Sequence, residues 1–248
     1  MKIVFALLFV LALAVFGVWF VFTDTTIRTV IEDSFTDNNV STELKGVRKG
    51  LFYSVFIDSM ALKQDGAEIA SLENVSIRVH PFSLLRANLS GSVEGTMYGG
   101  NVSGRIKFAR NSRDLNLDME KIRIEQVEFL KRIGIKGTGT ISGRFVADEA
   151  GAHIEFSTHD AAFEPATYSG RKVPLDMFHT IRGAMDIRGD TVNLAAVSLE
   201  GREARARLKG AIKNKIMDLK MEIMPGRTFS ENPFFLSDLG QYNVYPGY

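Results

Sequence analysis

The chain has 248 residues, of which 30 are basic and 29 acidic, and it contains no cysteine. The net charge of +1 and the absence of a basic block argue against a nucleic-acid-binding protein. Because cysteine is absent, neither disulfides nor thiolate metal sites can form. Hydrophobic residues make up 45% of the chain, which is well above a disordered composition, so the sequence predicts a folded body.

The first element in chain order is a run of twenty residues, 3–22, with no charged or strongly polar side chain. A helix rising about 1.5 Å per residue would extend this run to roughly 30 Å, the thickness of a bilayer's hydrocarbon core. Trp19, Phe20 and Phe22 lie at its far end, where aromatic rings favour the membrane–water interface. The run predicts an uncleaved, single transmembrane anchor over residues 1–22.

A cleaved signal peptide is the alternative for this segment. Ala12 and Ala14 fit a small-x-small cleavage site, but the rest of the apolar run would then remain as a hydrophobic terminus. Lys2 precedes the run, and the first charge after it is Asp24. This asymmetry predicts a cytoplasmic N-terminus and a body on the other side of the membrane.

After the anchor, the hydrophobic period identifies three further segments. Residues 23–39 are predicted to form a juxtamembrane helix and linker, because Ile27, Val30, Ile31 and Phe35 recur at helical spacing. From about Val40 the period changes to two, which is typical of antiparallel strands with one apolar face. The strands are expected over residues 40–225, with a C-terminal segment at 226–248. Short helices are expected near residues 82–86, 126–132 and 234–239.

Four glycines recur in a weak internal repeat, on the same parity as their apolar neighbours: Gly104, Gly143, Gly183 and Gly210. Mid-strand glycine marks a bend or a close approach, and glycine kinks are used to curve a sheet. The row predicts a mainly β fold with a long, strongly curved antiparallel sheet, a trough with an apolar interior. The alternative is a closed barrel or two-sheet sandwich in which the glycines relieve crowding in a packed core.

Three segments carry hydrophobic patterns, two of them with glycines: residues 44–52 (LKGVRKGLF), 69–85 (IASLENVSIRVHPFSLL) and 97–104 (MYGGNVSG). These segments resemble the AsmA-like superfamily of bacterial envelope proteins. The short length, the single anchor and the ending at 236–248 are most similar to its type II secretion system protein N branch. The resemblance covers roughly residues 40–245 and rests on patterns rather than on catalytic residues.

The resemblance implies a taco-like β trough, anchored in the inner membrane and projecting into the periplasm. Longer relatives are thought to carry phospholipid along the trough, and the type II branch occurs together with secretion machinery. The candidate partners are therefore the membrane, phospholipid and type II secretion components. About 15 strands spaced about 4.8 Å apart would reach only some 70 Å, so bridging the periplasm would require a partner or an oligomer.

Catalytic and metal-binding patterns were not found in the sequence. Residues 137–143 (GTGTISG) superficially resemble a dinucleotide fingerprint, but they have one residue too many before the last glycine and lead into a strand. His153 and His159 would lie about 20 Å apart on one strand, too far to share a metal. The histidines are therefore expected on the surface: His80, His153, His159 and His179. We expect neither an enzyme nor a cofactor.

The expected function is to hold or pass lipid, or another hydrophobic ligand, in an apolar β groove. The alternative is an accessory component of the secretion apparatus that acts through protein contacts, with the apolar face as ordinary core. Parity assigns nine residues to the groove lining: Val75, Ile77, Val79, Val102, Ile106, Phe108, Leu117, Ile141 and Phe145.

Overall fold

The computed structural model describes most of the body of the chain. The described residues are 17, 19, 23–35, 40–64, 66–84, 88–109, 112–132, 134–168, 171–173, 175–189, 191–202, 204–213, 216–225 and 243–244. The predicted anchor therefore lies outside the described residues apart from Gly17 and Trp19, and so does the helix expected near 234–239. Among the helices that the structure describes, none is long and apolar enough to cross a membrane.

The fold is mainly β, as the period-two pattern predicts. Fourteen strands form one large sheet in the order β1-β3-β4-β5-β6-β7-β8-β9-β12-β13-β14-β15-β16, with β2 paired to β3, and β10 and β11 form a separate pair. The described pairings are antiparallel except that of β16 with β15. The chain divides into two compact units, unit 1 (Met1–Met97 and Val102–Leu115) and unit 2 (Tyr98–Asn101 and Asn116–Tyr248).

Unit 1 is built from the first strands, and the apolar residues of alternating parity form its core. Register pairs Val55 with Ile77 and Ile57 with Val75, so these side chains share one face and are buried. The strands are β1 (Val40–Lys45), β2 (Arg48–Lys49), β3 (Ser54–Gln64), β4 (Ala67–Val79), β5 (Leu89–Met97) and most of β6 (Gly100–Ala109). The helix expected near 82–86 is present as α3 (Pro81–Leu84).

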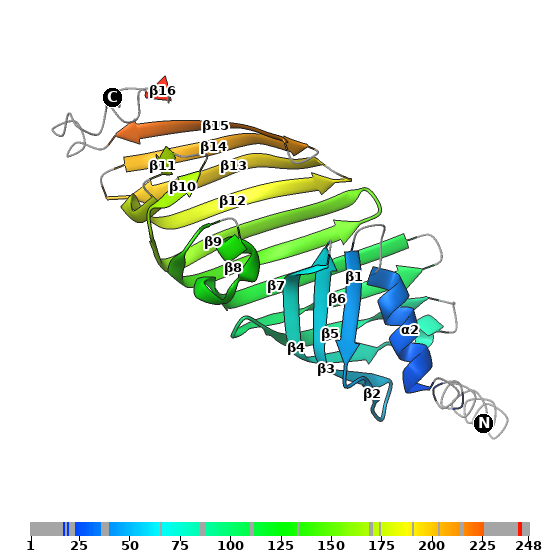
Figure 1. Ribbon diagram of the computed structural model, residues 1–248. Helices are drawn as coiled ribbons and strands as arrows, with labels where there is room; N and C mark the ends of the chain where they lie inside the picture. The colour runs from blue at the N-terminus through cyan, green and yellow to red at the C-terminus, as the bar shows by residue number, and fades with distance from the viewer. Residues whose placement is uncertain are drawn as a thin grey trace, which may run out of the picture. The chain divides into compact units, whose positions relative to one another are not determined.

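The predicted juxtamembrane helix is α2 (Asp24–Phe35), which lies against β1 (Figure 1). Its apolar residues Ile27 and Ile31 are both buried. The Arg28 guanidinium donates a hydrogen bond to the carbonyl oxygen of Leu44, whose side chain is fully buried. The amphipathic spacing read from the sequence thus corresponds to a helix that packs on the strands.

Unit 2 holds six long strands side by side and a group of short elements across one face of them (Figure 1). The short elements are η1 (Ile124–Gln126), α4 (Glu128–Arg132), the hairpin β10 (Ala166–Tyr168) with β11 (Arg171–Val173), and η2 (Leu175–Met177). The strands are β8 (Gly137–Asp148), β9 (Gly151–Phe163), β12 (Phe178–Arg188), β13 (Thr191–Gly201), β14 (Ala204–Lys213) and β15 (Ile216–Pro225), preceded by β7 (Ser112–Arg123) and followed by β16 (Asn243–Val244).

The strong curvature predicted from the glycine row is wrong for unit 2, whose strands form a twisted but not strongly curled sheet (Figure 1). The glycines serve close packing instead. Gly143 and Gly183 flank Phe156 across the sheet, and a Cβ at Gly183 would lie 2.8 Å from the Phe156 ring. The ring therefore extends over the position where Gly183 lacks a side chain, an arrangement that stabilises glycine in strands without bending them.

The other two glycines of the row occupy different settings. Gly104 lies half-buried in β6. Gly210 pairs with Leu194 beside an irregularity of β13, and its φ of +144° is one that side-chain-bearing residues rarely adopt. Glycines that share one sequence pattern thus have at least two physical roles. Gly183 leaves room for the Phe156 ring, and Gly210 allows a local backbone conformation that other residues rarely adopt.

Replacing Gly183 with alanine tests whether the Phe156 ring needs the space that this glycine leaves. The new Cβ would meet the Phe156 ring at 2.8 Å and the Val197 Cγ2 at 2.9 Å, so both side chains would have to shift. We expect Gly183→Ala to lower the free energy of unfolding by about 1–3 kcal/mol, measured by urea denaturation. The control Ser198→Ala, on the opposite face of the neighbouring strand, should change it by less than about 0.5 kcal/mol. A neutral Gly183→Ala would contradict the role given to the ring.

An apolar sheet face in unit 2 as the candidate functional site

The apolar side chains of unit 2 gather on one face of its sheet because register aligns them across the strands. Phe145 pairs with Ile154, Ile154 with Met185, and Met185 with Leu194, so this row runs over β8, β9, β12 and β13. A second row runs from Phe156 through Gly183 and Val197 to Leu208 and Met221. Residues directly opposite one another point to the same side of a sheet, and these rows define the apolar face.

One half of this face is covered. The short elements contribute Leu175, which is buried, and Leu130, Ile135 and Met177, which pack against the cluster. Within this cover, the Ile135 amide donates to the Leu130 carbonyl oxygen at 2.9 Å. The buried cluster, here the covered half, consists of Ile124, Ala161, Phe163, Leu175, Phe178, Val197, Leu199, Ala204, Ala206 and Ile223.

The other half of the face lies beyond this cluster and is partly exposed. Its side chains are neither fully buried nor part of the covered cluster, although they lie on the same parity. Partly exposed apolar side chains grouped on one surface make this group a candidate for a binding surface, because contiguous apolar patches are less common than scattered apolar residues. We call this group the open half: Phe145, Ile154, Met185, Ile187 and Val192.

The nine residues predicted to line the groove are divided between the two units. Ile141 and Phe145 are on the apolar face of unit 2, and Leu117 is half-buried in β7. The Phe108 side chain lies outside the described part of the structure. The remaining five are buried in unit 1, with 2–8% of their surface exposed: Val75, Ile77, Val79, Val102 and Ile106.

Ile154, Phe156 and Met185 belong to the same face but are not among the nine residues predicted from the sequence. The alternation of His153, Ile154, Glu155 and Phe156 was a usable signal. Met185 could not have been aligned with them from the sequence, because β9 pairs with β12 and the intervening hairpin β10–β11 is skipped.

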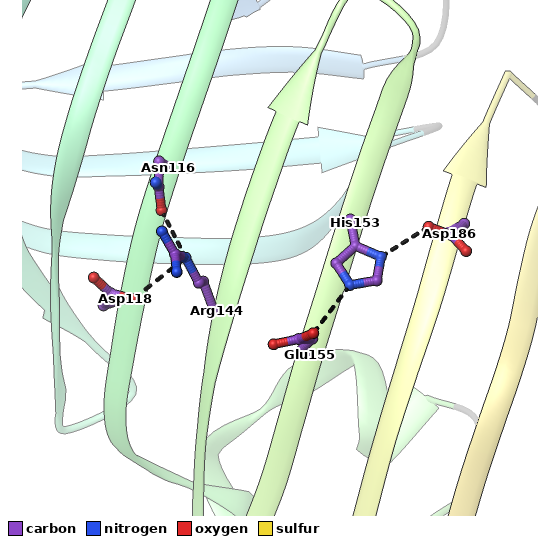
Figure 2. Close-up of polar contacts among 6 residues, drawn as sticks. All are labelled: Asn116, Asp118, Arg144, His153, Glu155 and Asp186. Atoms are coloured by element: carbon purple, nitrogen blue, oxygen red, sulfur yellow. Dashed lines mark hydrogen bonds and ion pairs between the residues drawn. The ribbon is translucent and has the colours of Figure 1, made fainter.

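The opposite, polar face of unit 2 carries a histidine held between two carboxylates (Figure 2). The ring nitrogens of His153 on β9 lie 2.8 Å from Asp186 Oδ1 on β12 and 3.4 Å from Glu155 Oε1. The bond to Asp186, followed by that to Glu155, raises the pKa of His153 above its ordinary value, because both carboxylates favour the protonated ring. His153 is thus an ion-paired surface residue.

A second group of polar contacts lies on the same face of unit 2, beside His153 and its two carboxylate partners (Figure 2). Arg144 Nε on β8 donates to Asn116 Oδ1 at 3.1 Å and lies 3.9 Å from Asp118 Oδ1 on β7. The ion-paired side chains are more than half exposed, and exposed pairs of this kind contribute little to stability. They connect the neighbouring strands β7 and β8.

Beside these contacts, and lined in part by Arg144 and Glu155, lies a shallow hollow of about 540 Å³ that is open to solvent. Small side chains form much of its lining, including Ser157, Ala184 and Ala196, while Arg182 stands at its side. No histidine is among its lining residues. Within the described residues, no group of three or more histidine, aspartate or glutamate side chains is placed to hold a metal ion.

The comparisons with known proteins add no relative. No protein-family model, no curated protein and no solved structure matches the chain. The resemblance to AsmA-like proteins stays a prediction from the sequence segments quoted above. The candidate site therefore rests on the geometry of the apolar face alone.

The ion pairs of His153 predict a pH dependence of stability. The pKa of His153 is higher in the folded chain than in the unfolded chain. The contribution of the His153 ion pairs to the free energy of unfolding is therefore fully present below the unfolded pKa of about 6.5, and it is lost as the pH rises through the folded pKa. We expect Asp186→Asn to bring the His153 pKa closer to its ordinary value, measured by NMR titration of the ring. Asn116→Ala, which removes a partner of Arg144, is the control. An unchanged His153 titration in Asp186→Asn would contradict the assignment.

Proposed function

We propose that this chain is a non-enzymatic protein that holds or passes lipid, or another hydrophobic ligand, on the apolar face of unit 2. The observation that carries the proposal is the open half, where apolar side chains continue beyond their cover and remain partly exposed. The resemblance to the AsmA-like superfamily and its type II secretion branch supports the same role. The same resemblance predicts the cellular setting, with an anchor in the inner membrane and a body in the periplasm.

The energetics favour an apolar ligand on such a surface. Each methylene removed from water contributes about 0.8 kcal/mol, so a dozen methylenes would gain on the order of 10 kcal/mol before the cost of ordering the chain. The four strands that carry the open half lie about 4.8 Å apart and span about 14 Å, enough for part of an extended acyl chain to lie across them. The proposed site is an open apolar surface and not a deep trough.

A second candidate function is that of an accessory component of the secretion apparatus. The observation that favours it is the outer edge of β15. There β16 pairs in parallel only with Glu222 and Ile223, and the rest of this edge has no strand partner among the described residues. Free edges pair readily with extended segments of other proteins. In this alternative the apolar face is ordinary core or contacts a protein.

Photocrosslinking of the full chain in its membrane separates these candidates. We expect benzoylphenylalanine at Phe145 to form adducts with phospholipid on illumination, detected with ³²P-labelled lipid. The matched control is the same residue at Val146, which is also partly buried but lies on the opposite face of β8. Adducts with protein alone at position 145 would favour the secretion component, and equal lipid adducts at both positions would contradict the apolar face as the site.

Aspartate substitutions test whether the open half is a surface or a core. Phe145→Asp should cost clearly less stability than the same change at a buried position, because the site is partly exposed, yet abolish the lipid adducts formed by benzoylphenylalanine placed at Met185 in the same protein. Ile106→Asp should cost at least about 3–5 kcal/mol, because Ile106 is only 7% exposed and an unpaired charge would be buried. The control Val146→Asp, on the opposite face of β8, should retain both the stability of the protein and the lipid adducts at position 185. An unfolded Phe145→Asp protein would identify the open half as core.

A further inference from the structure

The end of unit 1 at which β3 begins exposes three large apolar side chains. Leu51 and Phe52, in the turn between β2 and β3, are 72% and 75% exposed, and Phe82 in α3 is 70% exposed. Both segments belong to the same end of the strands, since the Val79 amide at the end of β4 donates to the Tyr53 carbonyl oxygen at 2.9 Å. We call Leu51, Phe52 and Phe82 the apolar tip.

The turn that carries the tip is fastened to Trp19. The Trp19 indole N–H donates to the Gly50 carbonyl oxygen at 3.1 Å, and the Lys49 ammonium donates to the Trp19 carbonyl oxygen at 3.2 Å. The Trp19 ring lies 5.1 Å from the Tyr53 ring, between centroids, and Trp19 is only 6% exposed. Because of these contacts, the position of Trp19 determines the position of the turn that carries the apolar tip.

The backbone of the turn adopts a conformation that is unfavourable for its residues. Phe52 and Tyr53 have φ values of +53° and +62°, in the left-handed region that bulky residues rarely occupy. The turn is closed by the Gly50 amide, which donates to the Ser54 carbonyl oxygen at 2.7 Å. A strained turn that presents apolar side chains to the surroundings, instead of burying them, is typical of a functional contact.

We propose that the apolar tip inserts into the interfacial region of a lipid bilayer, beside the predicted anchor. This inference rests on the membrane setting of the proposed function, because Trp19 belongs to the apolar run predicted to span the membrane. Aromatic and aliphatic side chains next to cationic ones suit this region, where long basic side chains extend to the lipid phosphates. The exposed Arg78, which pairs with Ser54 at the start of β3, stands at this end of unit 1.

The location of Trp19 favours a bilayer over a protein partner as the occupant. Tryptophan at the end of an apolar helix favours the membrane–water interface. Because two hydrogen bonds tie the turn to Trp19, Leu51 and Phe52 cannot be far from that interface when Trp19 occupies it. The tip would add three large apolar groups to the contact that a single helix makes.

The test uses the full chain in vesicles of phosphatidylcholine and phosphatidylglycerol, with quenchers attached to the lipid. Since the chain has no cysteine, Leu51→Cys and Phe82→Cys can each carry one fluorescent label that is sensitive to polarity. We expect both labels to shift to the blue, to be quenched by lipid-attached nitroxide, and to be shielded from iodide in solution. The control is Ser41→Cys, whose exposed residue pairs with Lys63 near the far end of β3; its label should stay accessible to iodide.

Trp19, the single tryptophan, reports on the anchor in the same sample. Quenching of Trp19 by brominated lipid without quenching of the labels at 51 and 82 would leave the anchor intact and overturn the inserted tip. Absence of both signals would overturn the membrane setting together with the tip. Labels shielded from iodide but not quenched by lipid would assign the tip to a protein contact and overturn the inference. Lipid on unit 2 is measured separately by the adducts at position 145, so the two outcomes are distinguishable.

Discussion

Antiparallel register is the constraint on which the candidate site depends. Each strand of unit 2 alternates apolar and polar residues, and a shift of one residue in any pairing would send its apolar set to the polar side. The observed pairings place Phe145, Ile154 and Met185 in one row, and His153 with Asp186 in a row of the other face. The apolar surface and the ion-paired surface are therefore two consequences of the same register.

Partial covering turns this apolar face into a candidate binding surface. The segments that cross it, η1 with α4 and the β10–β11 hairpin with η2, bury one half of it by contributing residues such as Leu175. The open half has no such cover among the described residues and stays partly exposed. A single continuous face thus serves as core at one end, where it stabilises the sheet, and as accessible surface at the other.

The glycines of unit 2 illustrate how one sequence feature permits two structures. Glycine on an apolar face removes a side chain, and the vacated space can be used to bend the sheet or to receive a neighbouring ring. Phe156 decides between them, because its ring extends over Gly183 and fills that space. The sheet of unit 2 is not strongly curled, so the proposed ligand would lie on a surface instead of inside a closed trough (Figure 1).

The two apolar surfaces of the chain have different physical origins. The open half of unit 2 arises from regular alternation along strands and is partly exposed. The apolar tip of unit 1 arises from a strained turn and a short helix and is 70–75% exposed. The proposed ligand would complete the first surface by adding apolar contacts, whereas the proposed insertion into a bilayer would bury the second.

The sequence by itself determined the mainly β architecture, the helix over Asp24–Phe35 and the short helices near residues 82 and 128, since these depend on local periodicity. It also placed Ile141 and Phe145 on a common face. Only the tertiary structure decided that Val75 is buried while Phe145 is partly exposed, and that His153 meets Asp186 across 33 residues. Parity is a property of each strand, but burial and cross-strand contacts depend on which distant segments pair with or lie over it.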